Sequence, residues 1–197
     1  MPSEPVADRT DPRAARHARS RSKILEEAWV LARRHGLGRL SLGELARSVG
    51  LRQPSLYTYF DSKADLYDAM FAQGNEQLWA EVASRSYSEH PGEAVKEFTR
   101  AVVAFCAADP TRFQLLFQRP IPGFEPSPES YSVALRFLER GRDLAAGAGI
   151  TRQRDMDIFT ALVAGIADQQ VANDPGGDRW LRLVDEVIEM FLDRLNA

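Results

Sequence analysis

Residues 40–66 read LSLGELARSVGLRQPSLYTYFDSKADL, and this stretch decides the fold of the N-terminal part of the chain. Ser41 is followed three residues later by Glu44, which is the spacing of a capping box. The box predicts a short helix that starts at Leu42. Apolar residues then recur at helical spacing until Gly50, which is expected to end the helix.

A second short helix is expected directly after this one. Pro54 fits the first turn of that helix, where the missing N–H costs nothing, and the helix should end near Phe60. Ser62 and Asp65 form another capping box, which opens a long helix. Two short helices joined by a glycine-containing turn are the layout of a helix-turn-helix, here about residues 42–61.

The second helix of this pair carries hydroxyls and rings in place of the usual charged surface. A helix that enters the major groove needs side chains that hydrogen-bond to phosphates and base edges. Arg52 and Gln53 stand at its leading end, where base contacts are expected. Lys63 and the N–H groups that open the next helix are suited to a phosphate. The predicted DNA-binding residues are Ser41, Leu42, Arg52, Gln53, Ser55, Tyr57, Thr58, Tyr59 and Lys63.

Charge is distributed unevenly along the chain. Residues 1–63 hold 12 Lys/Arg and 7 Asp/Glu, whereas the other residues carry a net charge of -8. This basic N-terminal part, here called the head, is joined to an acidic remainder, which indicates that the head binds a polyanion.

The motif "LA..VG" followed by "LY.YF..K..L", after a helix that starts at Ser20 and stops at Gly36, resembles the TetR family of bacterial transcriptional regulators. The resemblance covers residues 19–79. It implies that Tyr57, Tyr59 and Lys63 contact the DNA backbone. One departure is Arg52, which stands where the family often has a Ser or Thr N-cap. Arginine cannot cap a helix in that way, so either the cap comes from elsewhere or Arg52 serves DNA binding at a cost in helix stability of about 1 kcal/mol.

The remaining residues, 80–197, show helical periodicity interrupted by proline- and glycine-rich turns. Together with the head they predict an all-α protein of about nine helices. The last two helices are expected from about Gln153 to Ala172 and from Arg179. The predicted domains are a disordered basic tail over 1–18, the helix-turn-helix domain over 19–79 and a helical domain over 80–197.

The resemblance implies that the helical domain forms a homodimer and binds a small effector. A four-helix bundle made by the last two helices of each chain is expected to form the dimer. The predicted interface residues are Phe159, Leu162, Val163, Ile166, Val184, Ile188 and Phe191. Aromatic residues among the middle helices favour an apolar or aromatic effector. The predicted cavity residues are Phe98, Phe105, Phe113, Phe117, Tyr131 and Phe137.

Several classes of protein do not fit the sequence. The longest apolar run, residues 101–108, is too short for a membrane span, and the first twenty residues lack the apolar core of a secretory signal. Neither a catalytic motif nor a set of metal ligands is recognisable, so no enzyme, metal or cofactor is expected. Cys106 is the single cysteine and is expected to be buried core.

The sequence therefore predicts a cytoplasmic homodimeric DNA-binding regulator, expected to be a repressor that its effector releases from a pseudo-palindromic operator. An alternative keeps the DNA-binding head in an architectural or adaptor protein that has no small-molecule effector.

Overall fold

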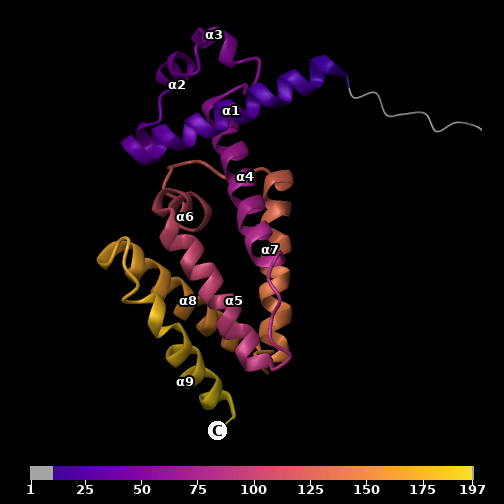
Figure 1. Ribbon diagram of the computed structural model, residues 1–197, viewed down its shortest axis with the longest axis vertical. Coiled ribbons are helices and arrows are strands. Elements are labelled where there is room, and N and C mark those ends of the chain that lie inside the picture. The colour runs from indigo at the N-terminus through magenta and orange to yellow at the C-terminus, as the bar shows by residue number, and fades with distance from the viewer. Residues whose placement is uncertain (1–10, 197) are drawn as a thin grey trace, which may run out of the picture. The chain divides into compact units, whose positions relative to one another are not determined.

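The computed structural model describes residues 11–196, and within that range every regular element is a helix (Figure 1). The prediction of an all-α protein is confirmed. The helices are α1 (Pro12–His35), α2 (Leu42–Ser48), α3 (Gln53–Leu56), α4 (Lys63–Ala83), α5 (Pro91–Ala108), α6 (Pro110–Phe117), α7 (Pro128–Gly147), α8 (Gln153–Asn173) and α9 (Val184–Asn196), with 3-10 turns at Leu37–Arg39 and Leu181–Leu183.

The chain forms two compact units that divide between Tyr67 and Asp68, within α4. The end of the N-terminal domain predicted from the sequence, residue 79, lies near the end of the same helix. No helix in the described range is both long and apolar enough to cross a membrane.

Helix α1 begins earlier than the sequence predicted. We expected disorder through residue 18, but the helix runs back to Pro12, while residues 1–10 of the expected tail lie outside the described residues. Two local features start it. The Asp11 side chain accepts a hydrogen bond from the Arg13 N–H at 2.9 Å, and Pro12 occupies the first turn. The disorder prediction is therefore wrong for residues 12–18.

The first unit has a core in which α1, α2 and α3 meet. Leu45 of α2 and Leu56 of α3 are fully buried, as is Ala28 of α1. The Tyr67 hydroxyl donates a hydrogen bond to the Leu37 carbonyl, which ties the start of α4 to the turn after α1. Burial of these apolar side chains is the main stabilising term for such short helices.

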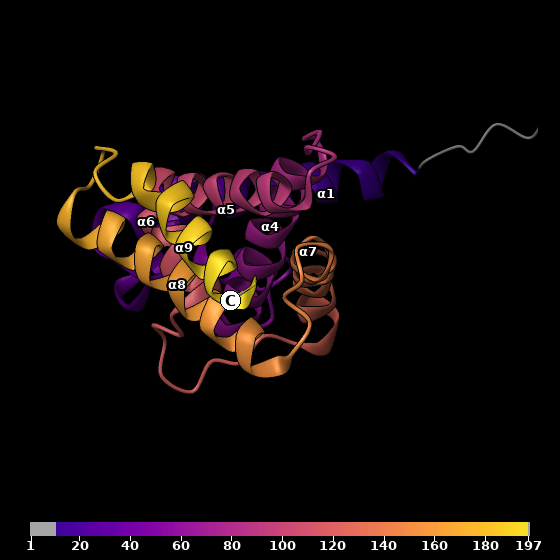
Figure 2. The ribbon, with the colours of Figure 1, turned by 90° about the horizontal axis from the view of Figure 1, so that it is seen from below.

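The second unit is organised around α5, which packs against α6, α7, α8 and α9 (Figures 1 and 2). Val95 and Val103 of α5 are fully buried. Figure 2 shows α8 and α9 side by side along α5. The last helix begins at Val184, five residues later than the Arg179 start that we predicted, because residues 181–183 form a 3-10 turn.

Gln170 fixes the connection between α8 and α9. The side chain is almost completely buried and satisfies four backbone groups of the turn. Its Nε2 donates to the carbonyls of Asp174 and Gly177 at 2.6 and 3.1 Å, and its Oε1 accepts from the N–H groups of Trp180 and Leu181 at 2.9 and 3.0 Å. A buried amide with all these partners specifies one turn geometry.

Asp68 plays a similar role at the start of α7. Its carboxylate accepts hydrogen bonds from the Ser127 N–H at 2.7 Å, the Ser127 hydroxyl at 2.8 Å and the Ser130 hydroxyl at 2.7 Å. Ser127 is itself the N-cap of α7 and accepts from the Ser130 N–H. One carboxylate therefore joins α4 to the first turn of α7.

We expect Asp68→Ala to lower the free energy of unfolding by about 2–3 kcal/mol, because the variant cannot make three hydrogen bonds to a half-buried charge. Asp143→Ala is the matched control, since Asp143 is exposed on α7. The control should change stability by less than about 0.5 kcal/mol. Urea denaturation monitored by circular dichroism measures both variants. Equal effects of the two substitutions would contradict the structural role of Asp68.

Candidate functional site

The helix-turn-helix starts as the sequence predicted. The Ser41 hydroxyl accepts the Glu44 N–H at 3.4 Å and caps α2. The Glu44 carboxylate lies 3.4 Å from Nε2 of His35, at the end of α1. At the start of α4, the Ser62 hydroxyl accepts the Asp65 N–H at 3.1 Å and donates to the Asp65 carboxylate at 3.0 Å. Both capping residues therefore act as predicted.

Helix α3 is shorter than the predicted segment from Pro54 to Phe60, because it has four residues and passes into a turn at Tyr57. Its N-cap, Arg52, makes no side-chain capping bond. The Thr58 hydroxyl donates to the Ser55 carbonyl at 2.8 Å, and such side-chain bonds compete with helix continuation. Leu56 and Phe60 anchor this segment to the rest of the unit, since both side chains are buried.

The nine predicted DNA-binding residues lie between the cap of α2 and the first turn of α4, and all are exposed or half-buried. Arg52, Gln53, Tyr57 and Thr58 have exposed side chains. Lys63 is half-buried; its Nζ lies 3.4 Å from the Gly38 carbonyl oxygen and 5.4 Å from the centre of the Tyr67 ring. The first unit thus leaves these side chains accessible while its apolar residues Leu45 and Leu56 are buried.

Gly43 leaves room for the side chain of Gln53. A Cβ atom at Gly43 would lie 3.2 Å from Oε1 of Gln53, so the amide rests against the first turn of α2. The smallest residue therefore stands where the two short helices approach most closely.

His17 makes a contact that the sequence analysis missed. Its ring stacks on Tyr59, with centroids 4.6 Å apart and planes at 19°, and its Nε2 lies 3.2 Å from the Thr58 carbonyl oxygen. One turn later, Arg21 lies over the Phe60 ring at 4.9 Å. His17 and the buried Ile24 are seven residues apart and so share a helix face. That spacing was the available signal, but it required α1 to start before Ser20.

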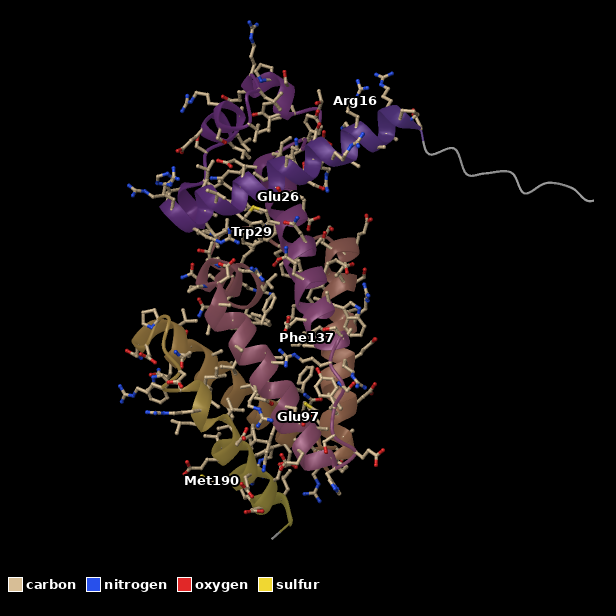
Figure 3. The ribbon with its side chains drawn as sticks, viewed as in Figure 1. Arg16, Glu26, Trp29, Glu97, Phe137 and Met190 are labelled. Atoms are coloured by element: carbon tan, nitrogen blue, oxygen red, sulfur yellow. The ribbon has the colours of Figure 1, made fainter. Side chains whose placement is uncertain are left out.

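The second unit contains a cavity of about 560 Å³ bounded by α5, α6, α7 and α8. Its volume is in the usual range for small-molecule sites. Figure 3 shows Phe137 on α7 directed toward α5. The lining is largely apolar and includes Phe98, Val102, Cys106, Phe113, Phe117, Phe137, Leu138, Gly141, Met156, Phe159, Val163, Ala164 and Ala167.

Four of the six predicted effector residues line this cavity: Phe98, Phe113, Phe117 and Phe137. The other two do not. The ring of Phe105 packs beneath the guanidinium of Arg112, 4.6 Å away. Tyr131 is 46% exposed on α7. Both lie on helices that bound the cavity, but their positions around the helix direct them elsewhere. Aromatic content alone could not separate these cases.

Polar groups gather at one part of the cavity lining. Gln118 donates a hydrogen bond to the Asp168 carboxylate at 2.8 Å, and Arg142 also lines the cavity. Phe117 and Leu138, which share this lining, are 43% and 42% exposed. The cavity therefore combines a buried apolar interior with a polar, solvent-exposed part.

Cys106 lines the buried part of the cavity, as 2% of its surface is exposed. Burial raises the pKa of its thiol to about 12. The thiol is therefore neutral near pH 7 and a poor nucleophile, because the thiolate is the reactive form. The prediction that Cys106 is buried is confirmed.

Most of the predicted dimer residues are buried within a single chain. Phe159, Ile166, Val184, Ile188 and Phe191 are buried in the core of the second unit, and Val163 lines the cavity. Leu162 is half-buried. The sequence pattern identified apolar residues of α8 and α9 correctly but did not separate the inward face from the outward face. The buried five are therefore core residues, which corrects their assignment to the interface.

A different set of residues faces outward on α8 and α9. Ala161, Gly165 and Ala172 are exposed on α8; Gly165 also lines the cavity, and a Cβ there would meet nothing within 4 Å. Met190 on α9 is 66% exposed, the most of any large apolar side chain in the described range (Figure 3).

Residues 24–70 match the model of the TetR family of bacterial regulatory proteins. The HTH-type transcriptional regulators Mb1846 of Mycobacterium bovis and Rv1816 of Mycobacterium tuberculosis are each 26% identical over an alignment of 183 residues, and the match covers 89% of this chain and 67% of theirs. Solved structures share the fold. The TetR-family regulator PfmR of Thermus thermophilus has a TM-score of 0.64 at 22% identity, covering 87% of this chain and 97% of PfmR. A TetR-family regulator of Marinobacter aquaeolei has a TM-score of 0.67 at 18% identity, covering 91% and 97%.

Proposed function

Because the chain belongs to the TetR family of DNA-binding transcriptional regulators, we propose that it acts as a homodimeric repressor that a small apolar or aromatic effector releases from its operator. The observation that carries this proposal is the exposed polar surface of the α2–α3 pair, held on a buried apolar core. The alternative, an architectural protein without an effector, is disfavoured by the apolar cavity of the second unit.

The proposed DNA contacts divide into two kinds. Arg52 and Gln53, at the start of α3, are placed to read base edges, where Arg prefers guanine and Gln prefers adenine. Tyr57, Tyr59 and Lys63 would hold backbone phosphates and set the register of the helix in the major groove. A dimer would present two such surfaces to half-sites about 34–36 Å apart or a modest variation on that spacing.

The first test is selection of bound sequences from a random duplex pool at roughly physiological salt. We expect an enriched inverted repeat. Tyr59→Phe should weaken binding to every sequence if its hydroxyl holds a phosphate, whereas Gln53→Ala should relax preference at one base position. Retention without a motif, abolished as salt rises, would favour the architectural alternative. Unchanged binding by both variants would refute the assigned roles.

The proposed dimer uses the outward face of α8 and α9. Small residues at 161, 165 and 172 permit close approach of a second helix, and Met190 supplies an apolar side chain that one chain leaves exposed. Two helices from each chain would then form a four-helix bundle. The symmetry of such a dimer matches that of an inverted repeat.

We expect Met190→Glu to raise the dissociation constant of the dimer by at least about tenfold, because the two-fold symmetry places the new carboxylate in the interface on both chains at once. Leu135→Glu is the control, since Leu135 is an exposed apolar residue of α7. Sedimentation velocity over a concentration series compares them. A Met190→Glu protein that dimerises as tightly as wild type would exclude this face.

The proposed effector site is the cavity among α5, α6, α7 and α8. Its apolar lining favours a ligand with a largely apolar or aromatic body, and Gln118, Arg142 and Asp168 offer polar contacts. Such a ligand would release DNA if it binds more tightly to a dimer conformation in which the two DNA-binding surfaces no longer match the half-site spacing. Helix α4 runs without interruption from Lys63 to Ala83 and is the proposed route of coupling.

The apolar dye N-phenyl-1-naphthylamine should bind wild-type protein with enhanced fluorescence. Val163→Trp should weaken dye binding at least about tenfold, because Val163 lines the cavity and the larger ring fills it. Val30→Trp is the matched control on α1, where Val30 is exposed. Equal dye binding by all three proteins would remove the cavity as the site of the proposed effector.

A further inference from the structure

The N-terminal half of α1 is a feature that the helix-turn-helix alone does not explain. The family match begins at residue 24, but α1 already begins at Pro12. At about 1.5 Å per residue, the twelve residues from Pro12 to Lys23 add about 18 Å of helix. This segment, Pro12–Lys23, is called the α1 extension below.

The α1 extension is attached to the turn that follows α3. His17 stacks on Tyr59 and lies within hydrogen-bond distance of the Thr58 carbonyl oxygen, at 3.2 Å. Tyr59 and Thr58 both belong to the proposed DNA surface. The extension therefore runs beside that surface, and Arg13, four residues before His17, lies about 6 Å further along the helix axis.

The α1 extension is strongly basic. It contains five Arg or Lys residues and no Asp or Glu. Arg13, Arg16 and Arg19 are exposed, and no carboxylate in the described range forms an ion pair with any of these three guanidinium groups. Figure 3 shows Arg16 near the start of α1.

These three arginines do not help the helix to form. They are spaced three residues apart, so each faces the next across one turn, and like charges at that spacing destabilise a helix. Because their side chains are exposed, they have no role in the core. Binding to a polyanion would relieve the repulsion that the isolated protein retains.

We infer that the α1 extension is a second DNA-contacting element, in which Arg13, Arg16 and Arg19 hold backbone phosphates next to those contacted through α3 and its following turn. This inference rests on the proposed function. The contacts add affinity and footprint without reading bases, because guanidinium–phosphate pairs carry no sequence information directly. His17 acts as a positioning residue that keeps the extension beside Tyr59. The extension, about 18 Å long, corresponds to at most about five base pairs of added contact in each half-site.

The test compares the full-length wild type with a variant carrying Arg13→Gln, Arg16→Gln and Arg19→Gln, since glutamine keeps a good helix propensity. Affinity for the selected operator is measured from about 50 to 300 mM salt. The slope of the logarithm of the association constant against the logarithm of salt concentration should decrease in magnitude by about 0.9 for each phosphate that the variant no longer neutralises. For a dimer in which each chain loses one phosphate contact, the decrease is at least about 1.8. Hydroxyl-radical footprints should shorten by a few base pairs in each half-site, with the base preference unchanged.

The matched control removes the same charge from the second unit through Arg85→Gln, Arg152→Gln and Arg154→Gln, all at exposed positions. Its salt slope should equal that of wild type. Replacement of Arg13, Arg16 and Arg19 by lysine should restore most of the slope, because the charge returns. His17→Ala should reduce the slope by less than the triple glutamine variant and leave helix content unchanged by circular dichroism.

The outcomes separate the inference from the proposed function. Sequence-specific binding by wild type with the same slope and footprint in the Arg13, Arg16 and Arg19 variant would overturn the inference and leave the proposed function standing. Equal decreases in that variant and in the control would also overturn it, because the effect would then be one of total charge. Failure of wild type to bind any duplex DNA would overturn both.

Discussion

The length of α3 is the constraint on which the DNA-binding unit depends. A helix of four residues cannot offset the entropic cost of nucleation through its own hydrogen bonds, so its position must come from tertiary contacts. Leu56 and Phe60 provide them from the inside, where both are buried. His17 and Arg21 provide them from α1, through stacking on Tyr59 and Phe60. The surface that α3 presents is therefore as rigid as the three-helix core beneath it.

The second unit follows a different physical logic. Helices α7 and α8 both pack on α5, and the small residues Ala164 and Ala167 of α8 are among those that line the cavity. Two polar side chains that join helices, Gln170 in its turn and Asp68 at the start of α7, make several hydrogen bonds each. The cavity is lined mainly by apolar side chains in between. We expect such a space to persist because hydrogen-bonded polar residues hold the helix ends while no side chain fills the space between the helices.

Much of this organisation was predictable from local patterns. The capping residues Ser41 and Ser62 follow from spacing alone, and the structure confirms them. The start of α1 was missed because residues 12–18 have a composition typical of disorder, and neither the cap at Asp11 nor the shared face of His17 and Ile24 was recognised. The faces of α8 and α9 were confused because periodicity identifies an apolar stripe but not which of two partners covers it. Phe105 and Tyr131 were misplaced for the same reason, since side-chain type does not determine direction.

Both units contain local features that cost stability. In the first unit, Arg52 occupies a cap position that it cannot satisfy, and Arg13, Arg16 and Arg19 repel one another along α1. In the second unit, Ser127 caps α7 and Asp109 caps α6 through side-chain hydrogen bonds, but the starts of α5 and α8 lack such a bond. Unfavourable local choices that tertiary contacts must offset are expected at functional surfaces, because folding alone gives no reason to keep them. All four arginines lie on the unit that matches the family model or on its helical extension, and all four are exposed. Their common feature is a positive charge that becomes favourable only when a polyanion is present, which is the physical basis for assigning the whole surface, α1 extension included, to DNA.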